Sequence, residues 1–133
     1  DNSESGFVNA EPDSLMRAVT NLLDNAIKYS PVPGKIFVRI ERDHNTDFDA
    51  LVISIRDQGT GIDPDLLPSI FTRFSARARE GSRVKSIGLG LAYVKAVAVR
   101  HGGSVEAENP VEGGALFRLS LPEALEFNPA HDV

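Results

Sequence analysis

The hydrophobic period changes along this chain in a fixed order, and that order limits the folds available to it. Apolar residues recur at helical spacing in residues 12–30 and again in residues 89–101. Residues 35–42, 51–55, 104–108 and 115–121 instead read as strands, and a short edge strand is expected at residues 7–10. This order favours an α+β fold, a two-layer α/β sandwich in which helices cover one face of a mostly antiparallel mixed sheet.

Local signals mark the ends of several elements. Pro12 suits the first position of the first helix. Asp63 is a suitable N-cap, with Pro64 in first position, for a short helix interrupted at Pro68. A polar segment at residues 43–49 makes a hairpin the simplest link between two strands, but leaves its register undetermined. We expect one domain over residues 1–133, with a core at 7–122, closed by Pro122, and a tail at 123–133.

Composition excludes several classes of protein. A net charge of -5 argues against nucleic-acid binding, which needs a clustered basic surface. The absence of cysteine excludes disulfides and thiolate metal sites. The apolar runs are too short to span a bilayer and no signal-peptide pattern opens the chain. The abrupt start of the sequence and its polar end lead us to expect a piece cut from a longer protein, and this piece should make no membrane contact of its own. Its expected location is the cytoplasm.

The first helix carries an unusual polar face. Asn21, Asn25 and Lys28 fall within about 60° of one another, and an apolar stripe that includes Leu15, Val19 and Leu22 is expected on roughly the opposite side. Asparagine is a mediocre residue inside a helix, so two of them four residues apart need a reason. A solvated face is the simple explanation, and a ligand site is the alternative.

Three further features share a theme with this helix, which is phosphate binding. A D-x-G-x-G turn begins at Asp57, a basic loop occupies residues 75–86, and a G-x-G at Gly88 opens the second helix. Helix-start amides attract anions, an amide oxygen such as that of Asn25 suits Mg²⁺, and an ionised Asp57 accepts from an exocyclic amino group. Singly, each feature also fits a turn, a packing device or a solvated loop. The three histidines show no metal or triad arrangement.

Together, the motifs resemble the catalytic ATP-binding domain of sensor histidine kinases, in the superfamily of gyrase, MutL and heat-shock chaperones. The resemblance covers essentially residues 7–122 and implies a Bergerat-type ATP-binding fold. Residues 21–29 resemble the family's Asn box, 57–62 its first glycine box, 71–74 its Phe box and 88–92 its second glycine box.

The resemblance implies a role for each matching residue. Asn25 with Asn21 would hold Mg²⁺, Asp57 would read adenine, and Arg73 or Arg77 would approach the phosphates. The catalytic residues would be Asn21, Lys28 and Arg73. The residues expected to bind ATP are Asn25, Lys28, Tyr29, Asp57, Gly59, Gly61, Ile62, Phe74, Arg77, Gly88, Leu89, Gly90 and Leu91.

The resemblance also implies an ATP lid at residues 75–87, where this chain departs from the family. The family commonly has glycine and a small hydroxyl residue where this chain has Ser86 and Ile87. Losing a glycine restricts φ, and isoleucine is bulky and β-branched. We expect impaired lid closure or phosphate approach.

The function that the resemblance implies is transfer of the ATP γ-phosphoryl to a histidine on a separate dimerisation domain, with a response regulator receiver domain downstream. This piece alone is expected to bind ATP but not to autophosphorylate, because none of its histidines lies in an acceptor motif. Alternatives are a hydrolytic ATPase, an anti-sigma-type serine kinase and a non-catalytic nucleotide sensor. Hydrolytic relatives carry glutamate at the position of Asn21, and a neutral amide cannot take a proton from water.

Overall fold

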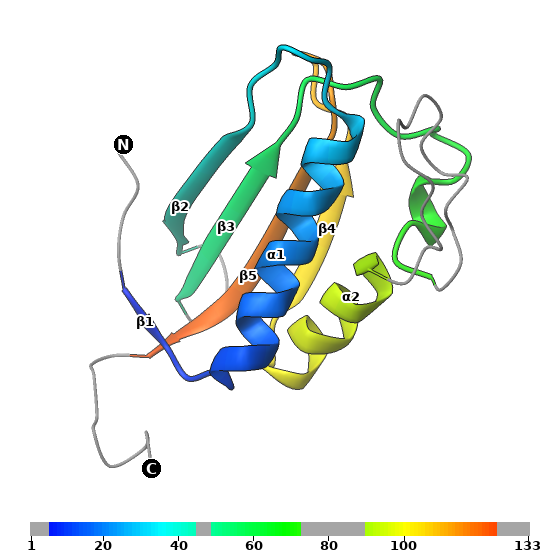
Figure 1. The fold of residues 1–133 in the computed structure, drawn as a ribbon. Helices are drawn as coiled ribbons and strands as arrows, with labels where there is room; N and C mark the ends of the chain where they lie inside the picture. Colours follow the sequence, from blue (N-terminus) through cyan, green and yellow to red (C-terminus); the bar gives the residue numbers. More distant parts are fainter. Residues whose placement is uncertain (1–5, 45–48, 73–89, 125–133) are drawn as a thin grey trace.

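The computed structural model describes residues 6–44, 49–72 and 90–124. Its elements are β1 (Phe7–Val8), α1 (Pro12–Tyr29), β2 (Phe37–Asp43), β3 (Ala50–Arg56), the 3-10 helix η1 (Leu67–Ser69), α2 (Gly90–Arg100), β4 (Ser104–Glu108) and β5 (Leu116–Ala124). The expected α+β two-layer fold is confirmed, because α1 and α2 lie on the same face of one sheet (Figure 1).

β5 organises the sheet. It pairs with β1, β3 and β4, and β3 pairs in turn with β2; each of these pairings is antiparallel. The β2–β3 register places Ile40 opposite Ile53 and Asp43 opposite Ala50, which fixes the hairpin that the sequence left open. Because side chains alternate between faces, this register directs the Ile53 and Ile55 side of β3 toward the helices.

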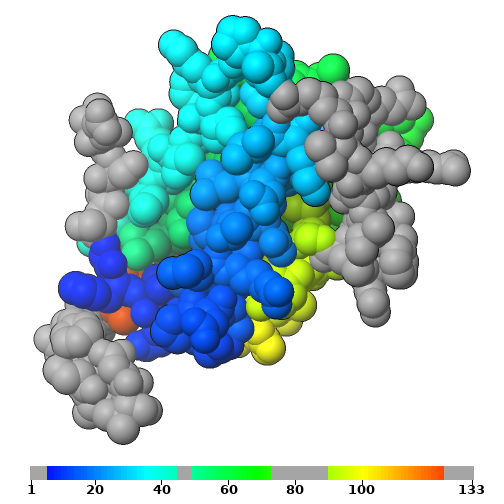
Figure 2. All heavy atoms as spheres, in the orientation of Figure 1, coloured from blue at the N-terminus to red at the C-terminus, as the bar shows by residue number. Residues whose placement is uncertain are grey.

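The core lies between the sheet and the two helices. Leu22 on α1, Val97 on α2 and Phe117 on β5 are each at most 1% exposed and belong to one cluster. The space-filling view shows α1 as a ridge along this face, with β2 and β3 on one side of it and α2 on the other (Figure 2). Burial of these apolar side chains is the main force that holds the helices on the sheet.

Several elements differ from the expected boundaries: β1 ends at Val8 and not at residue 10, and β2 begins at Phe37 and not at residue 35. The helix expected after Asp63 is only a turn followed by η1, because the Asp63 carbonyl accepts from the amides of Leu66 and Leu67 and no longer ladder forms. β5 continues beyond Pro122 to Ala124, because Glu123 and Ala124 pair with β1. The sheet therefore includes the first two residues of the predicted tail.

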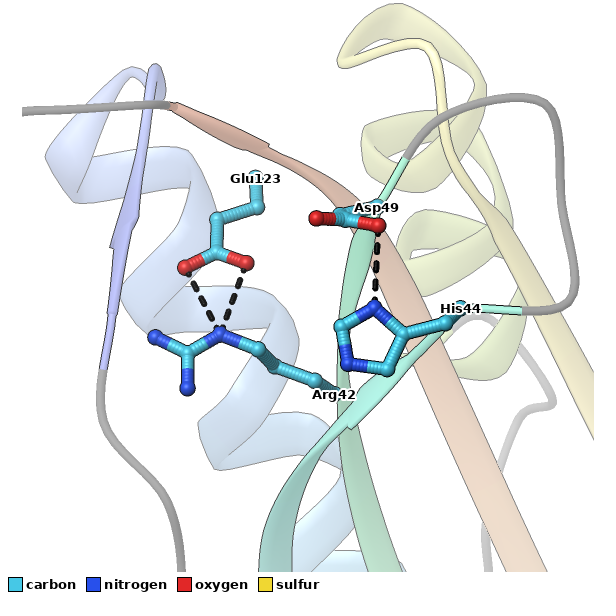
Figure 3. A network of polar contacts seen from close by, with 4 residues as sticks. All are labelled: Arg42, His44, Asp49 and Glu123. Carbon is cyan, nitrogen blue, oxygen red and sulfur yellow. Dashed lines mark hydrogen bonds and ion pairs between the residues drawn. The ribbon is translucent and has the colours of Figure 1, made fainter.

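An ion pair joins β2 to the end of β5 across the intervening β3. Arg42 Nε lies 3.0 Å and 3.1 Å from the two carboxylate oxygens of Glu123 (Figure 3). The Glu123 amide also donates to the Asp49 carbonyl. Asp49 also contacts His44 at 3.0 Å beside it. The Glu123 side chain is 12% exposed, so this ion pair is screened by water less than a fully exposed pair. It helps to hold the last residues of β5 on the sheet.

Within the described residues, neither helix combines the length and the hydropathy that a bilayer crossing requires.

Candidate functional site

The two asparagines of α1 have different environments. Asn21 Nδ2 donates to the Gly90 carbonyl at 3.1 Å, which joins α1 to the first residue of α2. Asn25 Nδ2 is buried and has no hydrogen-bond partner among the described residues. A buried amide nitrogen without a partner costs about 1–3 kcal/mol, so Asn25 is not placed there for stability.

The prediction that Asn21 and Asn25 lie on roughly the opposite side of the first helix from its apolar stripe is only partly correct. The fully buried stripe of α1 runs through Ala18, Leu22 and Ala26, and Ala18 lies about two turns before Asn25 on the same side of the helix. Leu15 and Val19 are only partly buried. The reason is that α1 packs against α2 as well as the sheet, which widens the covered face toward the amides.

Lys28 and Tyr29 occupy the last turn of α1, both half-buried, beside the glycine turn. A Cβ on Gly59 would overlap the Tyr29 carbonyl oxygen, so only glycine lets the turn approach the helix end this closely. The α1 terminus and the D-x-G-x-G turn, which are separated in sequence, are therefore in contact.

Asp57 is the only charged side chain that is buried within the described part of the chain, at 1% exposure. It follows β3 directly, and its Oδ1 accepts from the amides of Gly59 at 2.9 Å and Ala115 at 3.1 Å. Its own amide donates to the Ala115 carbonyl at 3.0 Å. Oδ2 is buried as well. A buried carboxylate is costly unless it is bonded, and here the backbone holds it in one orientation.

The rest of the glycine turn is held from the β4–β5 connection. Gly61 has a φ of +82°, which favours glycine, and Ile62 after it is 2% exposed. The Asn109 side chain accepts from the Ile62 amide at 2.7 Å and donates to the Ile62 carbonyl at 2.6 Å. Sequence reasoning missed Asn109, because its partner Ile62 is 47 residues away in the chain and no local pattern reveals the contact.

The remaining predicted residues fall in two groups. Gly90 begins α2, and Leu91 is partly buried against the core. Phe71, in the region that resembles the Phe box, packs edge-on against Phe117 with ring centroids 6.1 Å apart. The predicted site residues Arg73, Phe74, Arg77, Gly88 and Leu89, with the lid at 75–87, lie outside the described residues.

The donor set of the site consists of hydrogen-bonding groups and one cation. Within the described ranges, no group of three or more histidine or acidic side chains could hold a metal ion. The site offers instead a fixed carboxylate at Asp57, amides at Asn21 and Asn25, and a lysine on the last turn of α1. Mg²⁺ commonly takes one or two protein ligands and completes its shell with phosphate oxygens and water, which this set permits.

The two-layer α+β fold and this site together are those expected of an ATPase-type nucleotide-binding domain. Comparison with known proteins shows the family to which the chain belongs. The chain belongs to the family of histidine kinase-, DNA gyrase B-, and HSP90-like ATPases, whose model matches residues 10–125. It is 36% identical over 123 residues to the sensor protein KdpD of Clostridium acetobutylicum, which covers 90% of this chain and 13% of that protein. It is 41% identical over 116 residues to the sensor histidine kinase component HK1 of Mycobacterium tuberculosis, covering 87% of this chain and 65% of HK1.

Solved structures show the same fold. A mycobacterial sensor histidine kinase, MprB, matches with a TM-score of 0.74 and 36% identity over 87% of this chain and 76% of that one. The catalytic domain of histidine kinase ThkA matches with a TM-score of 0.71 and 28% identity over 87% of this chain and 71% of that one. The chain spans less than two thirds of the length of KdpD and of HK1.

Proposed function

We propose that this chain is the ATP-binding catalytic domain of a two-component sensor histidine kinase. The observation that carries the proposal is the Asp57 carboxylate, buried at the glycine turn and fixed by two backbone amides. In this role Asp57 accepts a hydrogen bond from the exocyclic amino group of adenine. The sensor kinases among the similar proteins support the assignment.

The purine pocket forms around that carboxylate. Gly59, Gly61 and Ile62 shape its wall, and Tyr29 stands beside it because Gly59 packs on the Tyr29 carbonyl. The glycine turn contacts α1 on one side and the β4–β5 connection on the other, so we expect the pocket to be formed before any ligand arrives. A preformed pocket loses little conformational freedom on binding.

The phosphate end of the site lies on α1 and the start of α2. We propose that Asn25, with Asn21 beside it, ligates the Mg²⁺ that accompanies ATP, and that Lys28 contacts the phosphates. Amide rotation by 180° exchanges oxygen and nitrogen, so the buried Nδ2 position of Asn25 also suits a ligating oxygen. Asn21 uses Nδ2 toward Gly90, and its Oδ1 is the atom suited to a cation. We propose that Gly90 and Leu91 also contact the nucleotide, and the same role stays a prediction for Arg73, Phe74, Arg77, Gly88 and Leu89, which lie outside the described residues.

The reaction we propose moves the γ-phosphoryl of ATP to an imidazole nitrogen of a histidine on a separate dimerisation domain, leaving ADP. A response regulator receiver domain then takes the phosphoryl group. The histidines described in this chain are poor acceptors: both ring nitrogens of His101 are engaged, by the Glu11 amide and the Val97 carbonyl, and His44 contacts Asp49. Since none of the three histidines in the sequence lies in an acceptor motif either, we expect the isolated chain to bind ATP without phosphorylating itself.

Hydrolysis is the competing activity of the same fold. It requires a general base for water, and position 21 carries a neutral amide that donates to the Gly90 carbonyl. Because position 21 lacks this base, we favour transfer of the phosphoryl group to a protein nucleophile over transfer to water.

Asp57→Asn tests the proposal at its centre. Asparagine keeps the oxygen that accepts from Gly59 and Ala115, so the fold should persist, but it replaces the other acceptor oxygen by a donor. We expect ATP affinity to fall about 10- to 100-fold and GTP affinity to change little, because guanine presents a carbonyl at that position. Calorimetric titration with both nucleotides measures this, with circular dichroism as the fold control. Equal losses for ATP and GTP would contradict adenine recognition by Asp57.

A further inference from the structure

Asn109 forms a two-point clamp on the backbone of one residue. Its Oδ1 accepts from the Ile62 amide at 2.7 Å and its Nδ2 donates to the Ile62 carbonyl at 2.6 Å. The partners fix the orientation of the amide, since a backbone N–H only donates and a carbonyl only accepts. A side-chain amide presents one donor and one acceptor side by side, so it matches the two backbone groups of a single residue as a neighbouring strand would.

The residue that Asn109 holds, Ile62, directly follows the glycine turn. Ile62 directly follows Gly61, whose φ of +82° is reached most easily by glycine, and the Ile62 side chain is 2% exposed in the core. Core packing holds the Ile62 side chain, and Asn109 holds its backbone. An ideal Cβ on Gly61 would lie 3.0 Å from Asn109 Oδ1, which shows how closely the clamp fits the turn.

The same connection holds the other end of the turn. Ala115 donates to Asp57 Oδ1 and accepts from the Asp57 amide. Gly114, with a φ of +75°, lies so close to Asp57 that a Cβ there would overlap the Asp57 carbonyl oxygen. The β4–β5 connection thus contacts the turn at Asp57 through residues 114–115 and at Ile62 through Asn109.

We propose that Asn109 is a positioning residue for adenine recognition. It acts through Ile62 and the turn to keep Asp57, with the Gly59 amide bound to it, in the orientation that reads the exocyclic amino group. This inference rests on the proposed function and adds to it a residue that lies 47 positions after Ile62 in the sequence. Asn109 itself is largely exposed, so its replacement leaves no cavity in the core.

Asn109→Ala is the direct test, and Val111→Ala is its matched control. Val111 belongs to the same connection and is fully exposed, so its truncation removes no contact of the turn. We expect Asn109→Ala to lower ATP affinity about 5- to 10-fold and to leave GTP affinity within about twofold, because loosening Asp57 matters only to the base that it reads. Val111→Ala should match the wild type for both nucleotides.

A second variant separates positioning from folding. Asn109→Asp keeps the size and the acceptor for the Ile62 amide but sets an oxygen against the Ile62 carbonyl. It should reduce the ATP-to-GTP preference in the same direction. If both variants lower the melting temperature but keep the wild-type preference, Asn109 is only structural and the inference is overturned. If the wild type itself does not prefer ATP, the proposed function fails first, and the inference fails with it.

Discussion

Asn25 is a residue that the fold does not need. Its Nδ2 is buried on the side of α1 that carries Ala18 and Leu22, and it finds no partner among the described residues. Replacing an unsatisfied buried amide removes a desolvation penalty, and alanine is also the better helix former by about 0.6 kcal/mol. Stability therefore does not account for Asn25, which agrees with the ligand role that we propose for it.

Asn25→Ala should separate stability from binding. We expect the free variant to melt at the wild-type temperature or slightly above it, and the rise in melting temperature caused by ATP with Mg²⁺ to be largely lost. Asp24→Ala, at an exposed neighbouring position on α1, is the control and should keep the ligand-induced rise. A variant that melts well below the wild type and still gains the full rise would mean that Asn25 serves the fold.

At the residue scale, the sequence could name candidate site residues but not their surroundings. The pattern singled out Asn21, Asn25 and Asp57, and their roles stay predictions. The sequence pattern placed the two amides opposite the apolar stripe, because helical periodicity indicates a single buried face. In the structure, α1 is covered by both the sheet and α2. Asn109 was missed because its clamp on Ile62 depends on the tertiary fold.

At the level of elements, His101 joins the end of α2 to the start of α1. Nε2 accepts from the Glu11 amide at 3.0 Å, and Nδ1 lies 2.8 Å from the Val97 carbonyl, to which it donates. Glu11 is the N-cap residue of α1 and makes no side-chain cap bond there. The histidine thus links two helix ends that the chain separates by 90 residues.

His101→Ala should destabilise the domain by about 1 kcal/mol, since it removes both bonds. For a domain of this size the melting temperature should fall by about 2–6 °C. His44→Ala is the matched control: His44 contacts Asp49 at the surface, and its loss should cost less than about 0.5 kcal/mol. Thermal melts of the two variants compare these costs, and an equal effect would mean that His101 does not tie the helices.

Element prediction succeeded where hydrophobic period and packing agree. The strand at 104–108 matches β4, and the first helix ends at Tyr29, beside the predicted boundary. The prediction after Asp63 was wrong. The capping residues there suggested a helix, but the structure has only a turn followed by η1. The prediction also stopped β5 at Pro122, because nothing local reveals that β1 pairs with Glu123 and Ala124.

At the level of the whole molecule, the sheet and the helices each contribute residues to the candidate site. The sheet delivers Asp57 at the end of β3 and Asn109 at the end of β4, and the helices deliver Asn25 and Gly90. The order of motifs was enough to predict this two-layer arrangement, because few folds accommodate that order of helices and strands. Strand order and register came only from the structure, since several pairings satisfy the same alternation.

The most direct test of ATP recognition is a calorimetric titration of the wild-type chain with ATP and with GTP, each with Mg²⁺ and with Mg²⁺ chelated. We predict saturable one-site binding of ATP with Mg²⁺, at least about tenfold weaker binding of GTP, and weaker ATP binding after chelation. A chain that is folded by circular dichroism and shows no ATP binding, or that binds ATP and GTP equally, would contradict the account.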